Sequence, residues 1–264
     1  MTLVANTNRS VNSQKMPLVS GVMASHFMPK ACSNSSKAGH DDCRLRNLCL
    51  AKGLSGKGLR QLDGIVKAAM PLKAGKHLYR QGDDFKSLYF VRSGFVKSYV
   101  TSSDGDELAV SFYMPGEVIG LDGLYSRQHT SSMITLQDTS FFEIPYLALE
   151  KLFASQPLLQ KRFTELQSRQ IVHEQEMTML LGQKTAASRL IAFLLNMSKR
   201  FGERRLSPSC FRLPMTRKDI GGCLGLTLET VSRLFTQLQE QELLTVKGRE
   251  VTLTNLKLSD SVSH

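Results

Sequence analysis

The chain has 264 residues, which is enough for one large domain or for two domains of ordinary size. Hydrophobic residues make up 41% and charged residues 22%, which excludes a wholly disordered chain, and no apolar run is long enough to span a membrane. The net charge of +11 is uneven: residues 1–52 carry seven basic and two acidic side chains, residues 53–183 carry fourteen of each, and residues 184–264 carry thirteen and seven. This distribution predicts a neutral middle part and a basic last third whose natural partner is nucleic acid.

Residues 1–42 are expected to form a flexible N-terminal arm, because they show no sustained periodicity and are rich in Ser and Asn. A transit peptide is the alternative, since residues 1–40 also lack acidic side chains. The five cysteines are an odd number with none between residues 50 and 209, which is a poor disulfide framework: Cys32, Cys43, Cys49, Cys210 and Cys223. We therefore expect a reducing compartment, the cytoplasm.

Residues 43–155 are expected to form a β domain that begins with a short helical stretch between residues 43 and 69. Short runs rich in Val, Phe, Tyr and Ile then predict seven strands: His77–Arg80, Ser87–Arg92, Phe95–Thr101, Glu107–Tyr113, Val118–Gly120, Ser132–Leu136 and Ser140–Ile144. Glycines interrupt these runs where turns with positive φ are expected: Gly75, Gly82, Gly94, Gly105 and Gly116. Regular short strands of this kind indicate a closed or double-sheet all-β unit.

Residues 156–183 are expected to form one long helix. Its heptad positions alternate in steps of four and three: Leu159, Phe163, Leu166, Gln170, His173, Met177 and Leu180. We interpret this seam as the interface of a dimer, because such a helix is longer than a small domain needs. The alternative is that the seam packs on the chain's own β domain. A second amphipathic helix is expected from about residue 184 to residue 201.

The segment TRKDIGGCLGLTLETVSRLFTQLQEQ, residues 216–241, predicts a helix-turn-helix. Thr216 is a suitable N-cap for the first helix, Gly225 supplies the tight turn, and Thr227 caps the second helix. The next segment, LLTVKGREVTL, predicts a wing hairpin around Gly248. The alternative is an ordinary helical hairpin whose charged residues face water. Together with the basic charge, the pattern indicates that residues 184–264 form a DNA-binding unit.

The span from about residue 40 to residue 255 resembles the CRP/FNR family of bacterial transcription regulators. The stretches SLYFVRSGFVKSY, FRLPMTRKDIGGCLGLT and LETVSR are similar to the FNR branch at nearly every position. The resemblance implies an α+β fold with an N-terminal β-roll (a cupin-like jelly roll), a long dimerisation helix and a C-terminal winged helix-turn-helix. It also implies a homodimer that binds a palindromic operator in double-stranded DNA and contacts RNA polymerase, in many cases as an activator.

In the FNR branch three side chains of the second helix recognise the half-site TTGAT, and here they are Glu229, Ser232 and Arg233. Their chemistry agrees, because Arg can bond to guanine, Glu can accept from a cytosine amino group, and Ser can contact either edge. Geometry further predicts phosphate contacts at the start of the first helix and in the wing, from Thr216, Arg217, Lys218, Lys247 and Arg249.

The resemblance also implies a [4Fe–4S] cluster held by three N-terminal cysteines and one cysteine just before Glu-Ile-Pro. Cys43 and Cys49 keep the spacing of two of these ligands, but His40 stands at the first position and Phe142 at the last. We therefore assign no cofactor and expect that the iron–sulfur sensor is altered or lost. The alternative is an oxygen sensor whose iron–sulfur cluster uses Cys32, Cys43, Cys49 and an irregular fourth ligand, with His40 as a further candidate.

Other functions fit the sequence less well. A cyclic-nucleotide site of this family needs a Gly-Glu pair and an Arg-Ser/Thr-Ala segment, whereas here Gly120 precedes Leu121-Asp122 and no arginine lies in HTSS, residues 129–132. Binding of haem or another small ligand by the β domain is an alternative, as is a protein that does not bind DNA. The histidines and carboxylates assemble no catalytic pattern, so we do not expect an enzyme.

Overall fold

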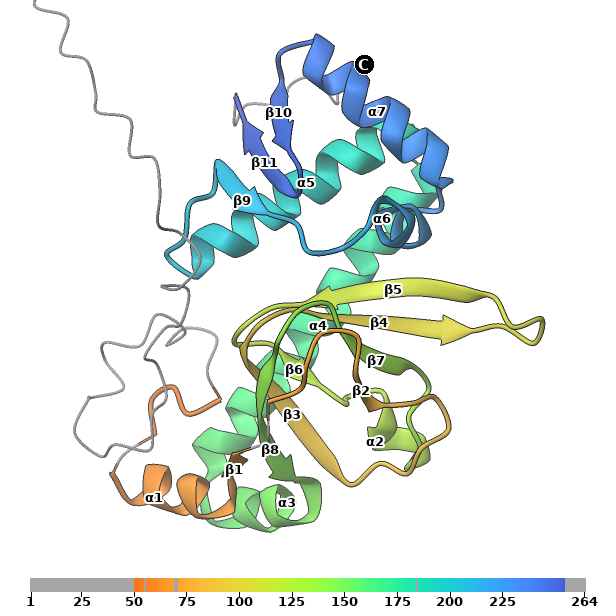
Figure 1. Ribbon diagram of the computed structural model, residues 1–264. Helices are drawn as coiled ribbons and strands as arrows, with labels where there is room; N and C mark the ends of the chain where they lie inside the picture. Colours follow the sequence, from red (N-terminus) through yellow and green to blue (C-terminus); the bar gives the residue numbers. More distant parts are fainter. Residues whose placement is uncertain (1–49, 55, 69–70, 184, 255–264) are drawn as a thin grey trace, which may run out of the picture.

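The computed structural model describes residues 50–54, 56–68, 71–183 and 185–254. A β domain (strands β1–β8) and a C-terminal unit (α5–β11) lie at opposite ends of the molecule, and α4 runs between them (Figure 1). The elements in chain order are α1 (Gly56–Ile65), β1 (Lys67–Ala68), β2 (His77–Tyr79), β3 (Ser87–Ser93), β4 (Val96–Thr101), β5 (Glu107–Tyr113), β6 (Val118–Ile119), α2 (Gly123–Ser126), β7 (Ser132–Thr135), β8 (Ser140–Pro145), α3 (Tyr146–Ser155), α4 (Pro157–Gln183), α5 (Ala186–Glu203), β9 (Cys210–Arg212), α6 (Arg217–Leu224), α7 (Leu228–Glu240), β10 (Leu244–Lys247) and β11 (Glu250–Leu253).

The β domain consists of two antiparallel four-stranded sheets, with strand orders β1-β8-β3-β6 and β2-β7-β4-β5. All seven strands predicted between residues 77 and 144 are present as β2–β8, so the α+β fold class with an N-terminal β unit is confirmed. The predicted helical stretch is shorter than expected. Helix α1 ends at Ile65, because Lys67 and Ala68 pair with Glu143 and Phe142 as strand β1, and residues 43–49 lie outside the described part.

The turns of the β domain lie at the predicted glycines. All five have positive φ: Gly75 (76°), Gly82 (90°), Gly94 (97°), Gly105 (87°) and Gly116 (91°). At Gly94 a second constraint applies, because a Cβ there would lie only 2.7 Å from Cα of Thr139. Only glycine therefore allows this turn and the neighbouring strand to approach each other.

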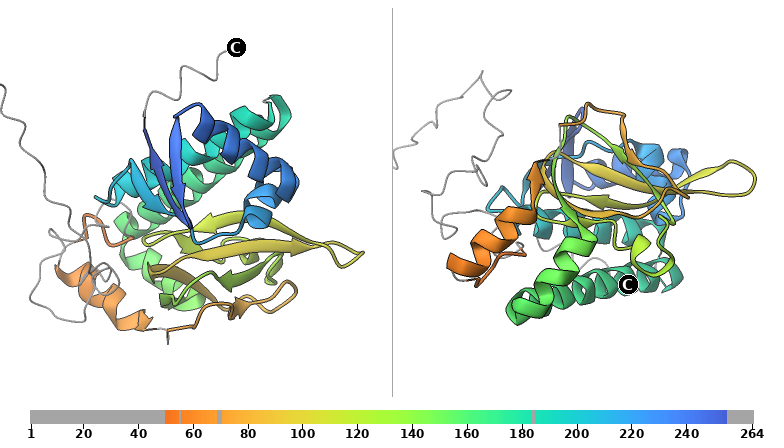
Figure 2. Two further views of the ribbon diagram at one scale, coloured as in Figure 1. Left: turned by 45° about the horizontal axis from the view of Figure 1, so that its top comes forward. Right: turned by 90° about the horizontal axis from the view of Figure 1, so that it is seen from below.

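Helix α4 connects the two ends of the molecule and contacts both. At its N-terminal end Leu159 and Phe163 are buried in a core shared with α1, α3 and β3, and α1 and α3 lie side by side there (Figure 2). Toward its C-terminal end Met177 and Leu180 pack against the core of the C-terminal unit. Among the described residues, no helix has the length and apolar character needed to cross a membrane.

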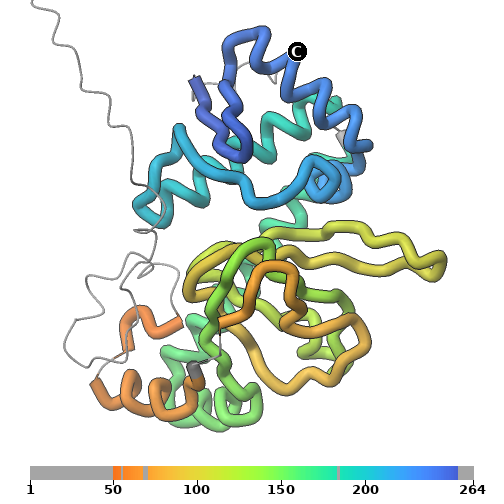
Figure 3. The backbone as a smooth tube through the Cα atoms, in the orientation of Figure 1, coloured from red at the N-terminus to blue at the C-terminus, as the bar shows by residue number. Residues whose placement is uncertain are grey.

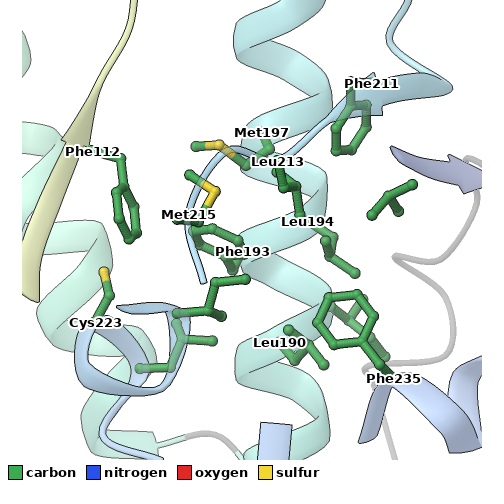
Figure 4. Close-up of a cluster of buried hydrophobic side chains, with 14 of the residues drawn as sticks. Phe112, Leu190, Phe193, Leu194, Met197, Phe211, Leu213, Met215, Cys223 and Phe235 are labelled. Atoms are coloured by element: carbon green, nitrogen blue, oxygen red, sulfur yellow. The ribbon is translucent and has the colours of Figure 1, made fainter. Parts of the chain in front are cut away.

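The C-terminal unit is built around α5, whose apolar face is fully covered. Leu190, Leu194 and Met197 are at most 1% exposed and contact side chains from α6, α7 and the small sheet β10-β11-β9 (Figure 4). This core does not end at the boundary of the unit. Phe112 of β5 belongs to the same core: its ring lies edge-on to the ring of Phe193, with 6.0 Å between the ring centres (Figure 4). The β domain and the C-terminal unit therefore share one hydrophobic cluster.

A charged cluster beside this shared core fixes α5 to the β domain. The carboxylate of Glu117 accepts hydrogen bonds from Arg200 at 2.6 Å and from Arg204 at 2.5 Å. Arg200 also donates to the carbonyl of Phe112, and Arg204, which is 2% exposed, donates to the carbonyl of Pro115. Burial alone would raise the pKa of Glu117, but the two guanidinium groups outweigh it and hold the pKa below its ordinary value of 4.5.

The position of Glu117 leads to a pH-dependent prediction. Above about pH 5, Glu117→Gln should lower the free energy of unfolding by roughly 3 kcal/mol, because it leaves two buried cations without their carboxylate. Since the folded-state pKa lies below the unfolded-state value, this stabilisation is present above 4.5 and is lost as the pH falls through the folded-state pKa. The stability difference between wild type and variant should therefore shrink at low pH.

Chemical denaturation at a series of pH values measures this difference. The control is Glu150→Gln, which changes an exposed glutamate on α3 and should leave stability unaltered at every pH. A wild-type advantage that persists undiminished at pH 3 would show that the ionised form of Glu117 is not its source.

Candidate nucleic-acid interface

Residues 216–241 form two helices, α6 and α7, joined by a short turn. Thr216 starts α6 with a capping box, because its hydroxyl accepts from the N–H of Asp219 at 3.1 Å and the Asp219 carboxylate accepts from the Thr216 N–H at 2.9 Å. Gly225 ends α6 with a left-handed φ of 61°, and the side chain of Thr227 caps α7. The predicted helix-turn-helix, with the predicted caps and turn, is confirmed.

Helix α7 has one buried and one exposed face. Val231 and Phe235 are at most 3% exposed and contact the core of the unit. Glu229, Ser232 and Arg233 lie on the opposite, exposed face near the start of the helix, and the Ser232 hydroxyl donates to a carbonyl one turn earlier at 2.9 Å. The structure thus places the three side chains that were predicted to contact bases on one accessible surface.

Two of the predicted phosphate contacts at the start of α6 have partners within the chain. The guanidinium of Arg217 lies 3.3 Å from the centre of the Phe235 ring, and burial lowers its pKa. The hydroxyl of Thr216 is held in the capping box with Asp219. Sequence patterns could not indicate this stacking, because Arg217 and Phe235 lie on different helices.

The wing hairpin forms as predicted from β10 and β11, with Lys247 paired to Glu250 and Gly248 at a φ of 63° between them. A third strand, β9, pairs with β11 and was not predicted, because three residues are too short for a periodicity signal. Lys218 on α6 and Lys247 in the wing are exposed. Arg249 is also exposed, but its guanidinium donates to the carbonyl of Pro214 at 3.0 Å.

Helix α6 also contacts the β domain, directly above the β4–β5 hairpin (Figure 3). Nζ of Lys97 on β4 lies 2.7 Å from Oδ1 of Asp219, and both side chains are mostly buried. Burial would raise the pKa of Asp219, but hydrogen bonds from Lys97 and Thr216 bring it below its ordinary value. The Cys223 thiol faces the carbonyl of Val110 at 3.5 Å, and burial raises its pKa to about 11, so it is a packing residue.

The predicted dimer seam of α4 faces the chain itself. Leu159 and Phe163 are 0% and 5% exposed in the single chain, and their burial leaves no surface for a second one. The other five positions are half-buried against the β domain or the C-terminal unit: Leu166, Gln170, His173, Met177 and Leu180. This burial also lowers the pKa of His173. The observation favours the alternative interpretation, in which the seam packs on the chain's own domains.

A different set of apolar side chains on α4 is open to solvent. Ile171 is 55% exposed, Val172 is 49% exposed and Met179 is 65% exposed. Val172 and Met179 are seven residues apart and share one face of the helix, and Ile171 lies about 80° from Met179 around the axis, so the three side chains form one broad exposed surface together with the polar positions Thr164 and Gln175. Sequence periodicity missed this surface, because a strip that contains mostly polar residues does not resemble a heptad seam.

The candidate cluster ligands Cys32, His40, Cys43 and Cys49 lie outside the described residues. Phe142, at the position of the expected fourth ligand, is half-buried, and the guanidinium of Arg92 lies 5.6 Å from the centre of its ring. A phenyl ring has no lone pair for iron, so this position does not fit a family-type cluster. Within residues 50–54, 56–68, 71–183 and 185–254, no three or more His, Cys, Asp or Glu side chains are grouped to hold a metal ion.

Two family models match the chain. The model of the cyclic nucleotide-binding domain matches residues 69–156, and the model of the Crp-like helix-turn-helix domain matches residues 188–258. The first covers most of the β domain together with α3, and the second covers most of the C-terminal unit.

Individual relatives match both parts of the chain together. The chain is 42% identical to the fumarate and nitrate reduction regulatory protein of Vibrio cholerae, over 81% of this chain and 86% of that protein. It is 44% identical to the transcriptional activator protein Anr of Pseudomonas protegens, over 80% and 86%. The solved structure of FixK2 from Bradyrhizobium japonicum matches with a TM-score of 0.68 and 31% identity, over 75% of this chain and 98% of that one.

Proposed function

Since the chain belongs to the CRP/FNR family of transcription regulators, we propose that it is an FNR-type regulator that recognises a palindromic DNA operator as a dimer. Members of this family regulate transcription and are not enzymes. The observation that carries the proposal is the exposed set of Glu229, Ser232 and Arg233 at the start of α7. These residue types can recognise base edges in the major groove.

The proposed half-site is TTGAT, and two-fold symmetry requires an inverted mate, ATCAA. The proposed spacing between the two half-sites is about four base pairs. Arg233 would contact guanine, Glu229 a cytosine amino group, and Ser232 either edge. Lys218 and Lys247 support this arrangement, because both are exposed on the same unit and can neutralise phosphates on either side of the bases. Arg217, Arg249 and Thr216 are secondary phosphate contacts, since each has a partner within the chain.

The proposed dimer interface is the open face of α4 around Ile171 and Met179. A helix of 27 residues is long enough to pair with its copy over several turns while its opposite face covers the chain's own domains. Glu174 is also exposed on α4 and would meet its mate unless the two helices are offset. The half-buried positions of the heptad seam, such as His173 and Met177, would lie at the edges of this interface.

We retain the division into an arm (1–42), a β-roll sensor domain (43–155), a dimerisation helix (156–183) and a winged helix-turn-helix domain (184–264) as part of the proposal. Contact with RNA polymerase and a cytoplasmic location follow from family membership and are proposed on that ground. The iron–sulfur sensor is proposed to be lost or altered, and the supporting observation is the phenyl ring of Phe142 at the expected anchor position.

The first prediction concerns base recognition. Arg233→Ala should cost about 1–3 kcal/mol of operator binding and relax preference at one base pair of each half-site. Lys218→Ala should weaken binding to all sequences alike and lower the salt slope by about one. The control is Lys151→Ala on α3, an exposed lysine far from α7 that should change neither quantity.

Binding selection from random DNA, followed by affinity measurements at several salt concentrations, tests both effects. Selection of a site unrelated to TTGAT, or an unchanged base preference in the Arg233 variant, would contradict the assignment.

The second prediction concerns the dimer. Ile171→Glu should give a folded monomer that still unfolds cooperatively, because the side chain is 55% exposed in the single chain and a charge there does not enter its core. Phe163→Glu should instead unfold the β domain, because it places a charge in its core. The matched control is Leu147→Glu on α3, which is 67% exposed and should leave both mass and stability unchanged.

Sedimentation equilibrium with and without operator DNA gives the mass of each variant. A dimeric Ile171 variant, or a monomeric wild type at micromolar concentration on operator DNA, would exclude the proposed interface.

The third prediction concerns the sensor. Operator affinity should be the same for protein prepared in air and protein prepared without oxygen, and a Cys43→Ala, Cys49→Ala double variant should bind equally well. Iron and acid-labile sulfide analysis accompanies the measurement, with Cys210→Ala as the control for an exposed thiol. An anaerobic gain of more than about tenfold that the double variant abolishes would instead establish a cluster with an unforeseen ligand.

A further inference from the structure

An anion-binding arrangement in the β domain is filled by the chain's own carboxylate. Asp122 lies between β6 and α2, and its Oδ2 accepts three hydrogen bonds from the segment that precedes β7. The donors are the N–H of Thr130 at 3.0 Å, the N–H of Ser131 at 3.1 Å and the hydroxyl of Ser131 at 3.0 Å. Successive backbone N–H groups that converge with a hydroxyl on one oxygen are a typical protein site for an anion.

The second oxygen of the same carboxylate faces two aromatic side chains. Oδ1 of Asp122 lies 3.3 Å from the hydroxyl of Tyr79 and 3.3 Å from Nδ1 of His129. The two rings stack with their centres 3.5 Å apart and an angle of 12° between their planes. His129 is 4% exposed, so this donor is fixed in place by packing.

The electrostatics of the site favour an ionised carboxylate. Burial alone would raise the pKa of Asp122, but hydrogen bonds from His129 and Ser131 outweigh it and bring the pKa below its ordinary value. Asp122 therefore carries its negative charge at neutral pH among five donor groups, from Tyr79, His129, Thr130 and Ser131, which we call the anion cradle.

The resemblance to the CRP/FNR family implies that its cyclic-nucleotide branch holds a phosphate at these two segments, and residues 69–156 match the model of the cyclic nucleotide-binding domain. This chain lacks the arginine that would clamp a phosphate there, and the remaining donors already have an anionic partner. We infer that Asp122 is an internal ligand of this anion cradle and holds its segments together without any cyclic nucleotide.

The internal ligand connects three elements, of which β2 is distant in sequence from the other two. Asp122 precedes α2, Ser131 precedes β7 and Tyr79 belongs to β2. Its carboxylate is covalently part of the chain, so it competes with any dissolved anion at a very high effective concentration. A phosphate that approached the cradle would also meet the negative charge of Asp122 and be repelled.

The test is an anion-rescue experiment that follows the melting temperature. Asp122→Ala should lower Tm by about 4 °C or more, because it leaves buried donors without an acceptor. Sodium acetate or inorganic phosphate should then raise the Tm of this variant in a saturable way, beyond the effect of sodium chloride at equal ionic strength. Wild type should show no such rise, and millimolar cyclic AMP or cyclic GMP should not shift its Tm.

The matched control is Asp138→Ala. Asp138 also accepts from a backbone N–H and a charged side chain, Ala74 and Lys73, but it is 62% exposed and has no enclosed donor ring. Acetate should not rescue this variant beyond the chloride effect. Stability of Asp122→Ala equal to wild type, or a loss without specific rescue, would overturn the inference.

Asp122→Asn provides an independent test if the alanine variant does not fold. It keeps the shape and one acceptor oxygen but removes the charge, so it should fold with a lower Tm than wild type and show no acetate rescue. An unchanged Tm for Asp122→Asn, or a nucleotide-dependent shift of the wild type, would refute an internal anionic ligand. None of these measurements uses operator DNA, so their failure would leave the proposed DNA-binding function untouched.

Discussion

The arrangement of the β domain and the C-terminal unit depends on the ion pairs of the Glu117 carboxylate with Arg200 and Arg204. Arg204 is 2% exposed, and a buried guanidinium is tolerable only beside a charge that compensates it. The same carboxylate binds Arg200, so α5 is fixed to the β domain at its last turn and at its C-cap residue. Because α5 also supplies the central face of the C-terminal core, this contact holds that core against the β domain.

A second contact sets the direction of the DNA-binding helices. Asp219 both completes the capping box of α6 and forms an ion pair with Lys97, so the start of α6 and its attachment to the β domain depend on one side chain. Under the proposed function, the distance between two recognition helices in a dimer is therefore set by the β domain as well as by α4. The spacing of the half-sites would then depend on the β domain and on α4 together.

Local patterns explain which parts the sequence could predict. The strands and their turns were predictable because alternating apolar runs were separated by glycines such as Gly94 and Gly105, whose φ values no other residue adopts easily. The helix-turn-helix was predictable because Thr216, Gly225 and Thr227 act on their own neighbours. The proposed dimer face could not be predicted, because α4 packs along its length on its own chain and apolar periodicity marks that contact rather than an outer one.

The long-range partners of Phe142 and Asp122 could not be predicted from the sequence for the same reason. The guanidinium of Arg92 lies over the Phe142 ring, and the hydroxyl of Tyr79 lies 3.3 Å from the Asp122 carboxylate. Under the proposal for Asp122, the chain itself supplies the negative charge that an external anion would otherwise bring. With the proposed internal ligand, the free energy that a signalling molecule normally contributes is already built into the fold. Under the proposed function, control of such a regulator then rests on the concentration of the protein, since the proposed mode of operator binding needs two chains to associate along α4.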